Sequence, residues 1–328
     1  MNTHWPSFEV TMLALGAMAA IAGSPAKADS YPTRPVMILS PAGAGSGPDV
    51  IARIVADRLT QAWGQQVLVV NRPGGGGAIA AQAAAAAPPD GHTLYLPLAS
   101  TFVVLPETQA KMPLDLARDL VPIGMIGEQP MVIAVNPALG INTLAELIAR
   151  AKGRPGEILF GAPRGTLPHL MGEMLRRRVG LDLTYIPSAG MRAMQDTIGG
   201  TIHVFIGDMA AVAGPMQGGS LKALAVASSS RLPDFPDLPT VEEAALGIGS
   251  FEARGWFALM APARTPDAIV QKVNRDLRIA LGEPEVKRKL AALGTYPRPM
   301  SPAETAAFIR SEQDLWRPIV NQLDLASQ

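Results

Sequence analysis

The chain has 328 residues, of which 48% are hydrophobic, 17% are charged and 5% are aromatic. Its 28 basic residues balance 28 acidic residues, so it lacks the basic excess that a nucleic-acid partner demands. It has no cysteine, which excludes thiol catalysis, disulfide bonds and cysteine-ligated metal centres. The four histidines are scattered, at positions 4, 92, 169 and 203, without the spacing of a metal site. We therefore expect a globular protein with no metal, no cofactor and no nucleic-acid partner.

The N-terminus indicates export. Residues 10–23 are apolar or small, and this run is too short to span a bilayer comfortably. Ala26-Lys27-Ala28 follows it and fits the small-x-small pattern of a cleavage site. No Lys or Arg precedes the run, and the alternative interpretation is a disordered or buried N-terminal segment. We expect residues 1–28 to be a signal peptide that is cut near Ala28, which makes the mature protein periplasmic.

Short apolar runs alternate with helical patterns over residues 36–96. We expect strands over 36–39, 67–70 and 93–96. Between the first two, apolar residues at helical spacing predict a helix with Asp49 as its N-cap and Gly64 at its end. The Gly74–Gly77 run opens an alanine-rich helix that reaches Ala87. This β-α-β-α-β order implies a parallel sheet covered by helices.

A second series of the same kind begins near Met131. We expect its strands over 132–135, 158–160, 183–186, 204–206 and 221–227, with a late strand over 256–260. Helix starts are indicated by Thr143 with Glu146, by Thr240 with Glu243, by Thr265-Pro266 and by Ser301-Pro302-Ala303-Glu304, and a further helix runs through His169 to Arg178. The late strand and the last helices are left over after the two series. The simplest arrangement is that the chain returns to the first lobe after it completes the second. Residues 29–130 plus 251–328 then form lobe 1, residues 131–250 form lobe 2, and the cleft between them is the default ligand site.

The turn after the first strand is one candidate site. It reads Ser40-Pro41-Ala42-Gly43-Ala44-Gly45-Ser46-Gly47-Pro48-Asp49 and leads into a helix start. Glycines there expose backbone N–H groups, which together with the helix N-terminus form a cradle for an anion. Pro48 breaks the dinucleotide-binding pattern, and neither a P-loop nor a nucleophile elbow is present. A plain strand–helix turn is the alternative; the ligand-binding candidates are Gly43, Ala44, Gly45, Ser46, Gly47 and Asp49.

The segment Gly161–His169 has the same place in the second series. Arg164 is suited to pair with a carboxylate, and Thr166 is suited to donate a hydrogen bond to one. His169 lies in the first turns of the following helix, where a lone histidine is more often structural than catalytic. Two matched turns, one per lobe, would face each other across a cleft. This pairing makes Arg164, Gly165, Thr166 and His169 the second group of candidates.

Other candidates are weaker. Ser100-Thr101 follow a strand end and are expected either to line the cleft or to form a surface turn. Asp208 follows the 204–206 strand and either fixes a polar ligand group or caps the next segment. The recognisable loops contain no convincing catalytic group, so we expect no enzyme and assign no catalytic residue.

Six motifs in order make the chain similar to the substrate-binding proteins of tripartite tricarboxylate transporters, the Bug family. They are Tyr31-Pro32-x-Arg34-Pro35, Asn71-Arg72-Pro73-Gly74-x-Gly76-Gly77, Pro89-Asp90-Gly91-x-Thr93-Leu94, Gly165-Thr166-x-x-His169-Leu170-x-Gly172-Glu173, Leu238-Pro239-Thr240-Val241-x-Glu243-Ala244 and Trp256-Phe257-x-Leu259-x-Ala261-Pro262. The resemblance runs from about Tyr31 to about Trp316. Each motif is modest, but six in the right order and spacing are highly specific.

The resemblance implies an α/β fold of the type II periplasmic binding protein class. Two doubly wound lobes would enclose a central ligand cleft and close on it like a Venus flytrap. It also implies a carboxylate ligand held by backbone N–H groups, hydroxyls and ordered water. The family's pocket loops fall on Gly43–Asp49, on Ser100-Thr101, on Arg164–Thr166 with His169, and on Asp208.

This chain departs from the family at three places in that implied pocket. The family's Pro-Phe-x-Pro-Gly-Gly turn reads Pro41-Ala42-Gly43-Ala44-Gly45-Ser46 here. Its Tyr-Lys-Gly reads Ser188-Ala189-Gly190, which adds Ser188 to the ligand-binding candidates, and its Asp-Asn pair reads Gly207-Asp208. The fold is therefore expected to follow the family, while the identity of the ligand stays open.

The function expected from these observations is capture of a small carboxylate by a monomeric periplasmic protein that delivers it to membrane carrier subunits. One alternative is a receptor of the same fold that presents its liganded form to the sensor kinase of a two-component system. A less favoured alternative is an enzyme that uses the cleft to act on an organic acid.

Overall fold

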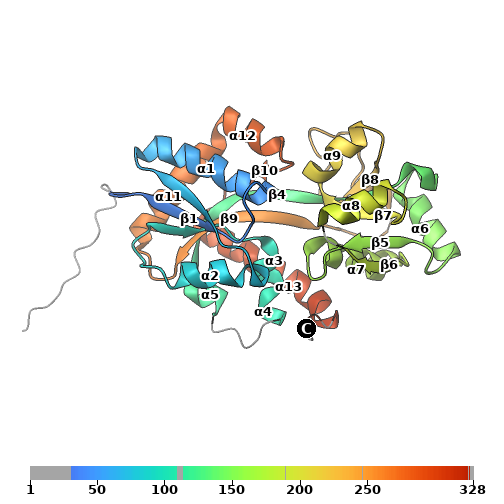
Figure 1. Cartoon of the computed structure of the whole chain (residues 1–328), viewed down its shortest axis with the longest axis horizontal. Coiled ribbons are helices and arrows are strands. Elements are labelled where there is room, and N and C mark those ends of the chain that lie inside the picture. The colour runs from blue at the N-terminus through green and yellow to red at the C-terminus, as the bar shows by residue number, and fades with distance from the viewer. Residues whose placement is uncertain (1–30, 109–113, 189, 246, 324, 326–328) are drawn as a thin grey trace, which may run out of the picture.

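The computed structural model describes residues 31–108, 114–188, 190–245, 247–323 and 325 (Figure 1). The expected signal peptide, residues 1–28, and its cleavage site near Ala28 lie outside the described residues. Within the described ranges, no helix is both long enough and apolar enough to cross a membrane.

The described elements follow the expected alternation of strands and helices. The strands are β1 (Val36–Ser40), β2 (Val67–Asn71), β3 (Thr93–Tyr95), β4 (Leu120–Val135), β5 (Leu159–Ala162), β6 (Thr184–Pro187), β7 (Val204–Asp208), β8 (Lys222–Val226), β9 (Arg254–Pro262) and β10 (Tyr296–Pro297). The helices are α1 (Gly47–Trp63), α2 (Ala78–Ala85), α3 (Ala99–Val103), α4 (Leu105–Thr108), α5 (Leu116–Asp119), α6 (Leu144–Gly153), α7 (Leu167–Val179), α8 (Gly190–Ile198), α9 (Met209–Gln217), α10 (Val241–Ala244), α11 (Asp267–Gly282), α12 (Pro284–Ala291) and α13 (Pro302–Gln322), with short 3-10 turns at Gly75–Gly77 and Pro137–Leu139.

The sheet confirms both β-α series. Its strand order is β2-β1-β3-β9-β4-β7-β5-β6, with β8 and β10 also paired to β4. In the first half β1 is parallel to β2 and β3, and in the second half β5 is parallel to β6 and β7. The late strand β9 returns to the first half and lies antiparallel between β3 and β4.

Strand β4 connects the two halves of the sheet. Residues 120–130 pair with β9, whereas residues 131–135 pair with β7 and β8. The sequence predicted only the 132–135 part, because two prolines and two glycines interrupt the preceding run. The glycines serve close packing: a Cβ at Gly124 would lie 2.6 Å from Nδ2 of Asn274, and one at Gly127 would lie 2.7 Å from the carbonyl oxygen of Tyr296.

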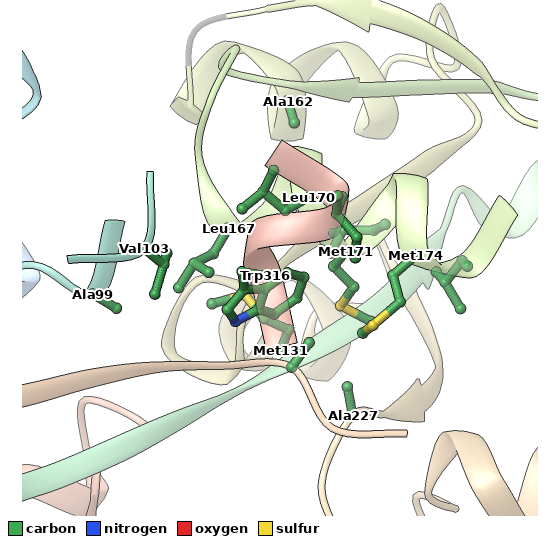
Figure 2. Close-up of a cluster of buried hydrophobic side chains, with 14 of the residues drawn as sticks. Ala99, Val103, Met131, Ala162, Leu167, Leu170, Met171, Met174, Ala227 and Trp316 are labelled. Carbon is green, nitrogen blue, oxygen red and sulfur yellow. The ribbon is translucent and has the colours of Figure 1, made fainter. Parts of the chain in front are cut away.

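Side chains of β4 contribute to apolar clusters on both faces of the sheet, and bulges near Ile123 and Ile126 interrupt their strict alternation. Ile123 and Ile126 face the cluster formed with α1, α11 and α12. Val132 and Ala134 face a cluster formed with α8 and α9. The largest cluster lies on the opposite face and extends without a break through both halves. Figure 2 shows part of it, where Trp316 of α13 lies among α3, α7 and β4.

Several helix ends match the sequence and three differ. The reciprocal capping pairs predicted for α10 and α13 are confirmed. The prediction that Asp49 caps α1 is wrong, because the N-cap is Ser46, three residues earlier, and the helix begins at Gly47. In α6, Thr143 accepts from the N–H of Glu146 as predicted, but the Glu146 carboxylate accepts from the N–H of Asn142 instead of that of Thr143. Helix α2 ends at Ala85, short of the expected Ala87.

Candidate ligand-binding site

The candidate residues follow the carboxyl ends of parallel strands. The Gly43–Gly47 loop follows β1, and Ser100 lies in α3 after β3. In the second half, Arg164–Thr166 follow β5, Ser188 follows β6, and Asp208 ends β7. Ligands of open α/β sheets bind beyond this end of the strands, where loop backbone and helix N-termini are available.

One pocket combines candidates from both halves. Its volume is about 300 Å³, and it is lined by Gly76, Ser100, Val104, Leu105, Thr108, Arg164, Gly165, Thr166 and Leu325. That volume lies at the lower end of the roughly 300–1,000 Å³ typical of small-molecule sites. Ser100, Arg164, Gly165 and Thr166 are thus brought together as expected from their positions in the chain. We call this space the interlobe pocket.

The interlobe pocket is suited to an anion. Its polar side chains are the hydroxyls of Ser100, Thr108 and Thr166 and the guanidinium of Arg164. Among the described residues that line it, none is acidic. Arg164 carries a fixed positive charge in a fork of donors that matches a carboxylate. Two larger hollows, of about 720 and 600 Å³, lie elsewhere, and no candidate residue lines either of them.

The second-half loop is a tight turn at the start of α7. The Thr166 hydroxyl donates to the carbonyl of Pro163 at 2.7 Å, and its N–H donates to the same oxygen at 3.3 Å. Gly165 has φ +70°, which favours glycine. Thr166 is the N-cap of α7, so the N-terminus of this helix, where helices offer backbone N–H groups to anions, lies at the pocket wall.

His169 supports this loop from inside the second half. Its Nδ1 accepts a hydrogen bond from the N–H of Gly165 at 3.1 Å. Its ring stacks on Tyr185 with 4.0 Å between centroids, and the Tyr185 hydroxyl donates to Ala162 at the other end of the loop. Burial lowers the pKa of His169, and the charge of Arg164 lowers it further against the opposing effect of Glu173. The ring is therefore neutral at pH 7, which Nδ1 needs in order to accept.

Asp49 organises the first-half loop. It is buried, and its carboxylate accepts from the Gly45 N–H at 2.8 Å, from Asn71 at 2.8 Å and from Arg53 at 2.9 Å. Burial acts to raise the pKa of Asp49, but these donors outweigh it and lower the pKa to about 2. Asn71 also donates to Ala42, so the motif after β2 ties down the loop after β1. Asp49 thus acts as an internal support, with Gly43, Ala44 and Gly45 exposed above it.

The remaining candidates do not line the interlobe pocket. Thr101 is fully buried and donates to Gly76 at 3.3 Å, so it lies behind the pocket wall. Asp208 caps α9 by accepting from the N–H of Ala211, which is one of the two roles expected for it, and burial raises its pKa. The Ser188 hydroxyl is buried and has no hydrogen-bond partner among the described residues, although a native buried hydroxyl normally has one.

Sequence reasoning missed several pocket residues. Gly76 belongs to the Asn71–Gly77 motif, whose glycines after β2 were a usable signal. Val104 lies between α3 and α4, Leu105 and Thr108 belong to α4, and Leu325 comes from beyond the end of α13. The spacing of Val104, Leu105 and Leu325 in the sequence does not distinguish a pocket wall from an ordinary core.

Comparisons with known proteins agree with this geometry. Residues 51–325 match the family model described as the tripartite tricarboxylate transporter family receptor. Protein BugT of Bordetella pertussis is 38% identical over 317 residues, which cover 94% of this chain and 95% of BugT.

Two solved structures with a bound carboxylate are similar. R. palustris Rpa4515 with adipate is 30% identical with a TM-score of 0.78, and the match covers 88% of this chain and 97% of that one. MatC from Rhodopseudomonas palustris with bound malate is 27% identical with a TM-score of 0.74, and the match covers 88% of this chain and all of that one (100%). The fold is therefore that of the two-lobed periplasmic binding proteins, and the chain belongs to the tripartite tricarboxylate transporter receptors, the solute-binding proteins of the Bug type.

Proposed function

We propose that this protein captures a small carboxylate in the interlobe pocket and delivers it to a membrane carrier from the periplasm. The observation that carries the proposal is the pocket itself, in which Ser100 of one half meets Arg164 and Thr166 of the other. The related structures with adipate and malate support the class of ligand. The family of transporter receptors supports the delivery step.

The two-sided lining supplies a mechanism for capture. A ligand that touches both Ser100 and Thr166 makes its full set of contacts only when the two halves lie close together. Such a ligand stabilises the closed arrangement by the difference in its affinity for the two arrangements. Closure of the two halves on the ligand then both holds the ligand and presents a closed surface to the carrier. No chemical step on the ligand is required.

Thermal unfolding of the full chain with a panel of organic acids tests the proposal. Ligands that bind the native state raise the unfolding temperature by mass action. We expect at least one di-, tri- or monocarboxylate to do so and neutral analogues, such as the matching amides, to have no effect. Arg164→Ala should weaken the response about tenfold or more in ligand concentration, as loss of a charge-assisted contact does. The matched control is Arg176→Ala on the outer part of α7, where Arg176 pairs with Glu173.

The outcomes distinguish whether a carboxylate binds at all from whether it binds in the interlobe pocket. No shift with any acid would contradict the proposal. A shift that Arg164→Ala leaves unchanged would move the carboxylate away from this pocket.

A further inference from the structure

A second contact joins the two halves on the face of the sheet opposite to α13. Helix α12 of the first half and α9 of the second half both lie on this face (Figure 1), and the turn at residues 293–296, which leads from α12 into β10, meets the start of α9. We propose that this turn is a stop that fixes the angle between the two halves, and thereby the spacing across the interlobe pocket. The second part of the inference rests on the proposed function, because it concerns binding of a carboxylate in that pocket.

The turn and α9 meet at Gly294, which is buried. A Cβ built on Gly294 would lie 2.7 Å from the backbone nitrogen of Ala210 and 3.3 Å from the Cβ of Met209. The nitrogen belongs to the backbone of α9, so it cannot move aside as the end of a flexible side chain can. The two halves therefore touch here backbone to backbone. They cannot come closer on this face without displacing α9.

Gln129 of β4 holds the turn in place. Its side-chain amide donates to the Leu293 carbonyl at 2.8 Å and to the Thr295 hydroxyl at 3.0 Å. The N–H of Thr295 donates to the Leu290 carbonyl of α12 at 2.9 Å. Gln129 lies two residues before Met131, where the pairing of β4 changes from β9 to β7. The turn is thus fixed to the strand that connects the two halves.

Tyr296 secures the same contact with a hydrogen bond. Its ring packs against the cluster of the second half that includes residues of α8 and α9, and its hydroxyl donates to Oδ2 of Asp234 at 3.2 Å. Burial and the charge of Asp234 raise the pKa of Tyr296 to about 12, so the hydroxyl keeps its proton at neutral pH. Asp234 belongs to the segment between β8 and α10. Separation of the halves on this face would break this bond, whereas closer approach is blocked at Gly294.

The helices beside the turn leave space between them. A hollow of about 310 Å³ lies next to Gly294 and is lined by Ala213 and Gln217 of α9 and by Ala291 at the end of α12. The turn, rather than this part of the two helices, is therefore the place where the angle between the halves is set on this face.

Distances between spin labels on the full chain test the stop without any ligand. The sequence contains no cysteine, so Ile279→Cys on α11 and Ala149→Cys on α6, both at exposed positions, place one label on each half. Gly294→Asn suits the left-handed backbone (φ +61°) but adds a side chain for which there is no space. We expect it to change the mean distance between the labels by about 1 Å or more, because close-packed interiors transmit such a displacement.

Two further variants isolate the cause of that change. Tyr296→Phe removes only the hydroxyl, and it should widen the distribution of label distances because the halves are no longer held against the stop. Gly219→Asn is the matched control: Gly219 has φ +71°, and a Cβ built there would meet no atom within 4 Å. It should leave the distances as in the wild type.

Titration calorimetry with adipate and malate tests the link to the interlobe pocket. An acid that binds the wild type should bind Gly294→Asn about tenfold more weakly, because Ser100 and Thr166 no longer contact it together. Gly219→Asn should bind the acid as the wild type does.

The results distinguish the inference from the proposed function. Unchanged label distances in both Gly294→Asn and Tyr296→Phe would overturn the inference, whichever acids bind. Altered distances with an unchanged affinity would overturn its link to the pocket. If the wild type bound no carboxylate at all, the proposed function would fall, while the label distances would still decide whether the turn is a stop.

Discussion

His169 illustrates how a single neutral ring supports a binding loop. Its Nδ1 accepts from Gly165, its ring stacks on Tyr185, and Tyr185 itself donates to Ala162. Both ends of the β5–α7 loop are therefore fixed from within the second half. The sequence suggested a structural role for this histidine, and the structure provides the contact that defines it. We propose that His169 acts on the ligand through Gly165, as a positioning residue.

This contact predicts a pH dependence of binding. His169 titrates near 6.5 when unfolded, and burial lowers its pKa in the folded chain. The acceptor at Nδ1 is thus intact above pH ~6.5 and is lost as the pH falls through the lowered pKa. We expect the affinity for a carboxylate probe to be constant from pH ~8 to ~6.5 and to fall below that range, where the probe is still ionised.

His169→Asn keeps an acceptor near Nδ1 but does not titrate. Its affinity should therefore stay level over the same pH range when measured by calorimetry. The other groups near the ring are Glu173, Arg164 and Tyr185, and the variant leaves all three in place. A wild-type affinity that does not change with pH, or an equal decline in the variant, would contradict this role.

At the scale of elements, hydrophobic periodicity, capping residues and helix-ending glycines in the sequence predicted most strands and helices. Gly64 ends α1 in a left-handed conformation, and the capping pairs of α10 and α13 form as expected. The misses also have causes. Helix α9 contains Gly214 and Pro215, and β4 begins with a run broken by Pro122 and Gly124, so local signals opposed the tertiary outcome.

The β1–α1 loop depends on Asp49 and predicts an effect of pH on stability. The lowered pKa means that the Asp49 carboxylate stabilises the fold above its unfolded value of 3.8, and that this contribution is lost as the pH falls through about 2. Asp49→Asn removes the negative charge and one of the two buried carboxylate oxygens that accept from Gly45, Asn71 and Arg53. We expect it to lower the free energy of unfolding by about 1–3 kcal/mol at neutral pH.

Urea denaturation measures this difference, which should shrink when both proteins are compared at pH ~2–3. Asp57→Asn is the control, because Asp57 is exposed on the same helix. Equal stability of Asp49→Asn and wild type at neutral pH would remove Asp49 from this role.

The candidate site was predictable where it follows from topology and unpredictable where it depends on distant segments. Ser100 and Arg164–Thr166 follow strand ends, and parallel strands bring such ends together. Leu325 and Thr108 join the same pocket only because α13 and α4 pack there. The family model begins its match at residue 51, after the Gly43–Asp49 loop in which this chain departs from the family's pattern. The ligand-binding roles of all the candidates, including those that line the interlobe pocket, stay predictions.

At the scale of the whole molecule, the two halves share one apolar core. The cluster that contains Trp316 includes residues of α2 and α3 in one half and of α6 and α7 in the other. Strand pairing changes between Pro130, which pairs with β9, and Met131, which pairs with β7. The lobe boundaries at residues 130 and 250 stay predictions. A shared core lets the halves rotate only within limits, so opening is expected to be small and to spare the α13 contacts.

Trp316 therefore carries a prediction about global stability. It is fully buried, and its ring nitrogen donates to the buried Glu312 at 3.2 Å. Trp316→Ala should lower the free energy of unfolding by about 3–5 kcal/mol, because it opens a cavity where both halves meet α13. Urea denaturation followed by circular dichroism measures this loss, and Leu315→Ala, with a side chain 38% exposed, should change it by less than ~1 kcal/mol. A loss of under ~1 kcal/mol for Trp316→Ala would show that α13 contributes little to joining the halves.

The central claim is that a carboxylate binds between the two halves at Ser100, Arg164 and Thr166. A crystal structure of the protein with the tightest-binding acid of the panel tests it most directly. We predict electron density for the carboxylate within hydrogen-bond distance of Thr166 or the Arg164 guanidinium. Density for the acid in another hollow, such as the one lined by Glu128, Arg254 and Arg298, would contradict the account.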